Sequence, residues 1–159
     1  MKIIIRENKK ILNATTDWTS RMGDTTPEEF AEITNGHVVE IPDYIDLSNL
    51  NINFFKENSD GSYSFNYAKY DTDLYEKKMA YIRNKRDWEC FRYVNRGQVW
   101  YDTLTQEQRE EIQTWYADWL NLTNREDLNI DNPQYPTPPS FIKDFVSYED
   151  TFDQFEDFK

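Results

Sequence analysis

The stretch TQEQREEIQTWYADWL, Thr105–Leu120, decides how the second half of the chain folds. Thr105 and Gln108 have the spacing of a capping box, in which the two side chains bind each other's backbone N–H groups at the start of a helix. Apolar side chains then recur every three or four residues and form one face of that helix: Ile112, Trp115, Tyr116, Trp119 and Leu120. The sequence therefore predicts a long amphipathic helix that begins after Thr105.

A second helix is predicted upstream, over residues 73–93, because no glycine or proline interrupts this stretch. Its apolar side chains form a helical stripe of Leu74, Tyr75, Met79, Tyr81 and Ile82. Its cations lie on the other faces: Lys77, Lys78, Arg83, Lys85 and Arg86. We interpret these cations as a solvated face that pairs with acidic residues elsewhere in the chain. A short loop with Gly97 joins the two helices into a helical hairpin.

The first 70 residues carry strand signals instead. Two β-hairpins are predicted, at residues 2–14 and 51–67, because apolar residues flank polar turns in both stretches. A further strand is expected at residues 37–41, with His37 at the edge of a sheet. These elements predict a small β-rich N-terminal unit.

A short helix is expected between the first hairpin and the strand at residue 37. Thr25 or Thr26 can cap its N-terminus, and Pro27 suits its first turn. Gly36 is expected to end it. The side chains expected to be buried are Phe30 and Ile33.

The C-terminal third contains two further segments. Residues 123–140 are predicted to be extended and irregular, because closely spaced prolines exclude a helix. Residues 141–159 interleave aromatic and acidic side chains, which is typical of an amphipathic helix or of a segment that folds on binding. The predicted fold class is therefore α+β. It comprises a β-rich domain with two hairpins and a short helix (1–70), a helical hairpin with a Pro-rich end (71–140), and an extended or helical acidic aromatic segment (141–159).

The charge balance bears on partners and location. Thirty Asp and Glu residues oppose eighteen Lys and Arg residues, for a net charge of −12. This balance disfavours nucleic acids and anionic membranes as partners and favours a basic protein. The apolar run Ile3–Ile5 is too short for a signal peptide, and a single cysteine fits a reducing compartment. We therefore expect a soluble intracellular protein.

The sequence offers no set of residues for catalysis. Zinc sites need clustered Cys and His, whereas this chain has only Cys90 and His37, far apart in sequence. None of the four glycines belongs to a phosphate-binding motif. Cys90 is expected to be a buried, unreactive thiol. We predict no catalytic residue, no metal and no cofactor, and hence a protein that is not an enzyme.

Four segments of the second half occur in a recognisable order. An Arg-containing helix (79–87) precedes a Leu-Thr-x-x-Gln helix start (102–108), a Trp/Tyr-rich helix (115–120) and a Tyr-Pro-Thr-Pro-Pro segment (135–139). This order resembles the phage tail assembly chaperone family, also called tail fibre assembly proteins. The resemblance implies a chaperone that binds a tail fibre or another tail protein in the host cytoplasm during assembly. The chain departs from the family pattern in lacking arginines in the third segment and in continuing beyond the fourth.

Tryptophan and tyrosine dominate the hot spots of protein interfaces. We therefore predict that the partner is bound through aromatic residues of the second half: Trp100, Tyr101, Trp115, Tyr116, Trp119, Tyr135, Phe141, Phe145, Phe152 and Phe155. For any single one of them, burial in the core between the two helices is the competing interpretation.

Two other functions stay open at this point. A structural component of the virion tail or its fibres could descend from such a chaperone and remain in the particle. An acidic DNA-mimic inhibitor would need carboxylates spaced like phosphates on one surface, which a net charge of −12 permits.

Overall fold

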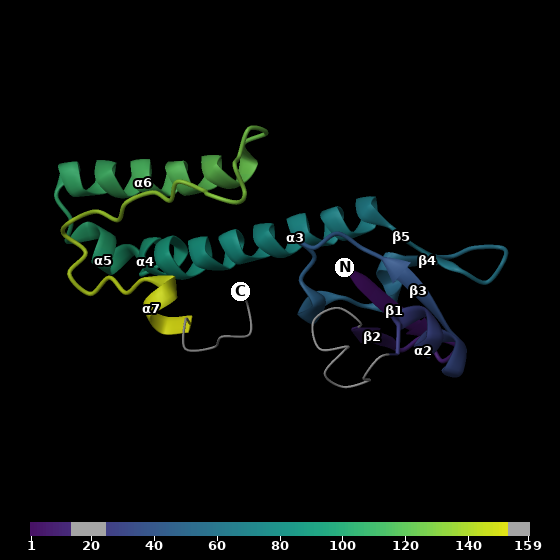
Figure 1. Cartoon of the computed structure of the whole chain (residues 1–159). Coiled ribbons are helices and arrows are strands. Elements are labelled where there is room, and N and C mark those ends of the chain that lie inside the picture. Colours follow the sequence, from purple (N-terminus) through teal and green to yellow (C-terminus); the bar gives the residue numbers. More distant parts are fainter. Residues whose placement is uncertain (14–24, 153–159) are drawn as a thin grey trace. The chain divides into compact units, whose positions relative to one another are not determined.

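The computed structural model describes residues 1–13 and 25–152, except the side chains of Asn13 and Phe152. The fold is α+β, as predicted, with a small N-terminal sheet and a helical hairpin (Figure 1). The chain divides into two units, Met1–Asp73 and Leu74–Lys159. The described part of the C-terminal segment, residues 141–152, thus lies within the second unit.

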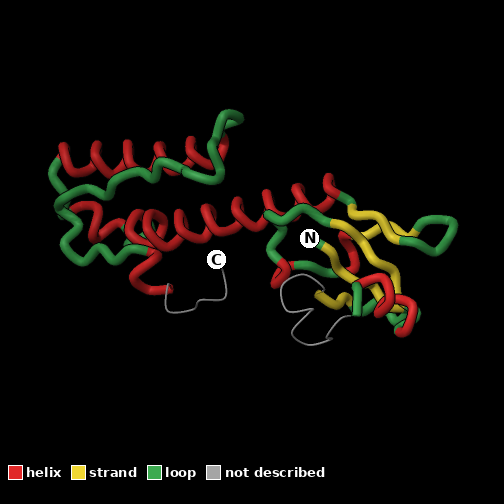
Figure 2. Tube along the Cα trace, viewed as in Figure 1, coloured by secondary structure: helices red, strands yellow, loops and turns green. Residues whose placement is uncertain are grey.

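The first unit contains a three-stranded antiparallel sheet in the order β2-β1-β3 (Figure 2). The strands are β1 (Lys2–Arg6), β2 (Ile11–Asn13) and β3 (Gly36–Glu40). The first predicted hairpin and the strand after Gly36 are therefore confirmed. His37 lies on β3, an edge strand of this sheet, as expected.

The central strand β1 is buried on both faces of the sheet, because Ile3, Ile4 and Ile5 are all fully buried. Ile4 packs with Ala31 of helix α2 (Pro27–Ile33) on one face. Ile3 and Ile5 point to the other face, since successive side chains of a strand alternate. There they join the main core of the unit, which also contains Val39, Ile41, Ile45, Phe54, Phe65 and Tyr70.

Helix α2 begins as the sequence predicts, with Thr26 and Glu29 forming a capping box. Its end and its buried face differ from the prediction. Ile33 is 75% exposed, whereas Ala31 is buried, and Phe30 packs against the same cluster as predicted. The helix ends before Gly36, and Asn35 adopts a left-handed conformation (φ 49°). Gly36 is required for another reason: a Cβ atom there would lie 2.8 Å from Cγ2 of Ile4.

The second hairpin pairs β4 (Phe55–Glu57) with β5 (Tyr63–Phe65), around a turn in which Gly61 has a φ of 82°. It is shorter than predicted. The segment Ile52–Phe54 forms a 3₁₀ turn, because the Asn51 side chain accepts a hydrogen bond from the Asn53 backbone N–H (2.9 Å) and caps it. A similar 3₁₀ turn, Leu47–Asn49, precedes it.

The second unit contains most of the helical hairpin, and Figure 1 shows α6 beside α3. The hairpin is formed by α3 (Tyr67–Arg86), a π-helical turn (Asp87–Phe91), α4 (Arg92–Val94), α5 (Gln98–Asp102) and α6 (Gln106–Asn124). The predicted upstream helix begins six residues earlier than expected. Its predicted stripe is buried only from Met79 onward, whereas Leu74 and Tyr75 are exposed.

The predicted helix after Thr105 is confirmed, including both hydrogen bonds of its capping box. Its core-facing residues pack against α3 and α4. The whole buried cluster consists of Met79, Ile82, Cys90, Tyr93, Ile112, Trp115, Trp119, Leu122 and Ile142. The chain after α6 is irregular, as predicted, and runs back along this helix to a short helix, α7 (Tyr148–Phe152) (Figure 2).

Candidate functional site

Two of the predicted contact residues belong to the core. Trp119 is 0% exposed and Trp115 is 3% exposed, because the reversed C-terminal segment covers the side of α6 that α3 leaves free. The Tyr135 ring lies 5.8 Å from the Trp119 ring, and Phe145 lies 6.3 Å from Trp115. The prediction of direct partner contact is therefore corrected for Trp119, for which the competing interpretation of burial holds. Trp115 is buried in the same core but also lines the groove described below.

Other predicted contact residues keep some accessible surface. Tyr116 is 37% exposed and packs beside Phe91, with ring centroids 5.5 Å apart. The half-buried members of the set are Trp100, Tyr101, Tyr135, Phe141 and Phe145. Phe155 and the side chain of Phe152 lie outside the described residues. Among the predicted contact residues, the accessible apolar surface thus lies at Tyr116 and on α5, where Val99 is largely exposed.

Several cations of α3 pair with acidic residues, as expected from the sequence. Lys78 binds Asp131, Arg86 binds Asp87 at 2.8 Å, and Lys85 binds two carboxylates. Exposed pairs of this kind contribute little stability, typically about 0–1 kcal/mol. The Lys85 group differs because it is buried.

Residues 141–152, here called the C-terminal strap, are anchored to the hairpin by apolar contacts. Ile142 is buried in the core, and Phe145 stacks on Tyr93 with ring centroids 5.6 Å apart. The Tyr93 hydroxyl donates to the Asp144 carbonyl (3.0 Å) and accepts from the Val146 backbone N–H (2.8 Å). One buried tyrosine thereby fixes the backbone on both sides of Phe145.

A second anchor, here called the polar latch, consists of Lys85, Glu89 and Glu149. The Lys85 ammonium donates to Glu89 (2.6 Å) and to Glu149, and Lys85 and Glu89 are only 4% and 5% exposed. Glu89 also accepts from the Tyr148 backbone N–H (2.7 Å), and Glu149 accepts from the Tyr81 hydroxyl (3.2 Å). The i,i+4 spacing of Lys85 and Glu89 signals a helical pair, but nothing local in the sequence points to Glu149.

Acid is expected to release the C-terminal strap. Burial acts to raise the pKa of Glu149, but the hydrogen bond and charge of Lys85 outweigh it, and the pKa is lowered. The hydrogen bond from Arg96 lowers the pKa of Asp144. The folded-state pKa values of these two carboxyl groups lie below their unfolded values of about 4, so the ionised carboxylates stabilise the strap fully when the pH is above about 4. This stabilisation is lost as the pH falls through the lowered folded-state pKa values.

Hydrogen exchange of the Val146 amide measures this release. Its protection factor is expected to fall when the pH is lowered from 7 to 3. Glu149→Gln should have lower protection at pH 7 and a smaller further decrease, because the Glu149 carboxylate no longer titrates. Equal protection at both pH values in the wild-type chain would contradict the expectation.

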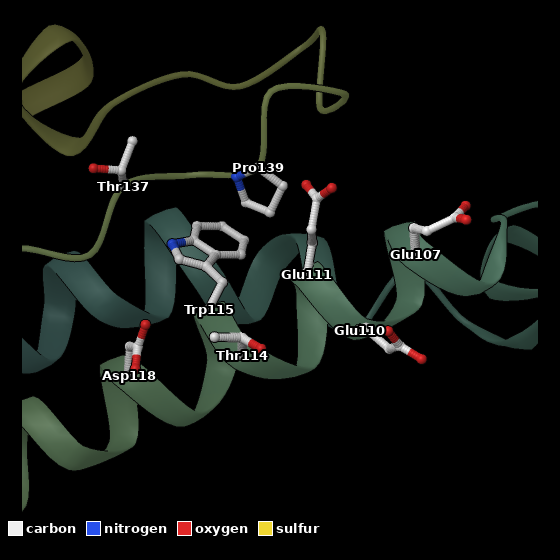
Figure 3. A pocket seen from close by; sticks show the side chains of 8 residues that line it. All are labelled: Glu107, Glu110, Glu111, Thr114, Trp115, Asp118, Thr137 and Pro139. Carbon is white, nitrogen blue, oxygen red and sulfur yellow. The ribbon is translucent and has the colours of Figure 1, made fainter.

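A groove lies between α6 and the Pro-rich segment and has a cavity volume of about 440 Å³. It is referred to below as the acidic groove. Figure 3 shows Trp115 at its back, Thr137 and Pro139 on one side, and side chains of α6 on the other. Its lining is formed by Glu107, Glu110, Glu111, Thr114, Trp115, Asp118, Thr137 and Pro139. The sequence alone places the carboxylates on the polar face of α6. It does not show that they lie across a groove from Pro139.

The described residues offer little for covalent chemistry. Burial raises the pKa of the Cys90 thiol to about 12, which makes it a poor nucleophile, and His37 belongs to the other unit. Within residues 1–13 and 25–152, no three His, Cys, Asp or Glu side chains are grouped so that they could hold a metal ion. In the same part of the chain, no helix has the length and apolar character needed to cross a membrane.

Comparison with known proteins adds no relative: no protein-family model, no curated protein and no solved structure matches the chain.

Proposed function

We propose that this chain is an assembly chaperone that binds a phage tail fibre or another tail protein and is not an enzyme. One observation supports this proposal above others. The four segments that resemble the tail assembly chaperone family are far apart in sequence, yet all four contribute to a single packed cluster. Met79 and Ile82 represent the first, Leu104 the second, Trp115 and Trp119 the third, and Tyr135 the fourth.

This packing fits the work of a chaperone. Fibrous tail proteins expose apolar surface and unpaired strand edges before they assemble, and such surfaces aggregate. A rigid hairpin with exposed aromatic and aliphatic groups near Tyr116 and Val99 can cover part of that surface. The acidic residues around these groups would keep the complex soluble.

Co-expression tests the proposal. A tail fibre protein from the same genome is expressed with and without this chain, and the soluble, correctly assembled fibre is measured by size-exclusion chromatography. The chain is expected to raise this yield several-fold. Tyr116→Ala and Trp100→Ala should reduce the gain, whereas Asn121→Ala, an exposed control on α6, should not. A fibre that assembles equally well alone would contradict the proposal.

Purified particles distinguish a chaperone from the structural alternative. An assembly chaperone is expected to be absent from virions, so immunoblots of purified particles should lack this chain. Its presence at a fixed ratio to the fibre protein would favour a structural component of the tail instead.

A further inference from the structure

We propose that the acidic groove binds an extended, arginine-containing segment of a partner protein. The proposal rests on the proposed function only for the identity of the natural partner, a tail protein. The chemistry of the groove itself specifies the kind of segment that it binds, as three features indicate.

The first feature is uncompensated negative charge. Four of the eight lining residues are carboxylates: Glu107, Glu110, Glu111 and Asp118. Glu110 accepts a hydrogen bond from Gln106 (2.8 Å), and Glu107 accepts one from Thr105 (3.2 Å), but both donors are neutral. Within residues 1–13 and 25–152, none of the four carboxylates forms an ion pair. The lining contains no lysine or arginine, so a cationic ligand meets no repulsion there.

The second feature is an unused hydrogen-bond donor. The indole N–H of Trp115 is buried and has no hydrogen-bond partner, although a buried donor without an acceptor costs free energy. In Figure 3 its nitrogen is turned toward the end of the groove at Thr137 and Asp118. A backbone carbonyl of an extended segment is the kind of acceptor that this donor lacks. A free metal ion or a lone ammonium group would not supply one.

The third feature is the spacing of the carboxylates. From Glu107 to Asp118 the row extends about 17 Å along α6, because each residue advances a helix by about 1.5 Å. An extended chain covers this length with five or six residues, and alternate side chains point to the same side. Alternate side chains recur about every 7 Å, which matches the advance of about 6 Å from Glu107 to Glu111, so arginines at alternate positions can pair with these two carboxylates. Asp118 lies about 10 Å further along the helix, near the next arginine but one. Arginine suits these sites better than lysine, since its planar guanidinium binds a carboxylate through two parallel hydrogen bonds.

A peptide titration tests the proposal without any tail protein. The probe is a heptapeptide of alternating serine and arginine, and the control peptide has glutamine in place of each arginine. Binding is followed by NMR through the assigned Trp115 indole N–H resonance of the full chain. We expect saturable shifts with the arginine peptide, weakened by added salt. No shift of this resonance, or equal shifts with the glutamine peptide, would overturn the proposal.

Matched variants identify the residues responsible. Glu110→Gln/Glu111→Gln is expected to weaken binding of the arginine peptide about five- to tenfold, because two exposed charge pairs are lost. Glu126→Gln/Asp150→Asn removes two exposed carboxylates of the same unit that lie outside the groove, and its affinity should stay within about twofold of wild type. Amide spectra check that both variants remain folded. Equal affinities for the two variants would place binding elsewhere and overturn the proposal.

The groove variant also separates this proposal from the proposed function. In the co-expression experiment, Glu110→Gln/Glu111→Gln should lose part of the gain in soluble fibre protein. If that variant keeps the full gain, the groove does not hold this partner and the groove proposal fails, while the chaperone proposal stands. If the peptide binds as expected but the wild-type chain gives no gain, the chaperone proposal fails and the groove proposal stands.

Discussion

Trp119→Ala is expected to lower the free energy of unfolding of the second unit by about 3–5 kcal/mol, the usual cost of removing a buried tryptophan or phenylalanine side chain. Trp119 is fully buried and belongs to the core cluster that joins α3, α6 and the C-terminal strap. Small domains are stable by only about 5–15 kcal/mol, so much of the stability should disappear. Urea unfolding followed by circular dichroism at 222 nm measures the loss.

An exposed residue of the same helix provides the control for this substitution. Asn121→Ala changes a solvent-exposed side chain of α6 and should shift the free energy of unfolding by about 0.5 kcal/mol or less. A Trp119→Ala chain with an unchanged urea midpoint would mean that the tryptophan is not a core residue. The large expected cost also means that loss of fibre binding by Trp119→Ala would report unfolding rather than a lost contact.

Lys85→Met is expected to be as costly, at about 3–5 kcal/mol, for an electrostatic reason. The substitution preserves a long apolar stem but removes the ammonium group of the polar latch. Glu89 would then be buried without the cation that lies 2.6 Å from its carboxylate, and Glu149 would lose its ion pair. Urea unfolding of the variant measures the effect.

Two further variants test this explanation. Lys78→Met breaks the more exposed pair with Asp131 and should cost about 1 kcal/mol or less. The double variant Lys85→Met/Glu89→Gln should be more stable than Lys85→Met alone, because the uncompensated charge is gone. The glutamine carbonyl can still accept the hydrogen bond from the Tyr148 backbone N–H. A double variant that is less stable than the single one would refute the electrostatic explanation.

Local signals explain which parts of the fold were predictable. The capping boxes at Thr26 and Thr105 and the turn at Gly61 depend on a few neighbouring residues, so their elements appear where the sequence places them. The short 3₁₀ turn after Asn51 was missed because a side-chain cap competed successfully with the alternating strand pattern. Ile33 was expected to be buried beside Phe30, but the sheet beneath α2 accommodates Ala31 and Phe30.

The sequence predicted which residue types contribute to the candidate site, but not which of them are buried and which are accessible. The aromatic pattern of α6 indicates a helix that buries one face, and the sequence alone does not distinguish a partner from the chain's own strap as the cover of that face. The contacts that decide it join residues about 15 to 65 positions apart, such as Tyr135 with Trp119, Tyr93 with Phe145, and Lys85 with Glu149. No local pattern encodes such pairs.

The return of the chain along α6 after this helix ends has a consequence for synthesis on the ribosome. Phe145, which packs on Trp115, is added 25 residues after Leu120, or about 1–5 s later at 5–20 residues per second. Until this later segment has left the ribosome and has docked, the hairpin cannot bury the aromatic face of α6 that Phe145 covers. The delay before docking therefore sets how long this aromatic face is open to aggregation.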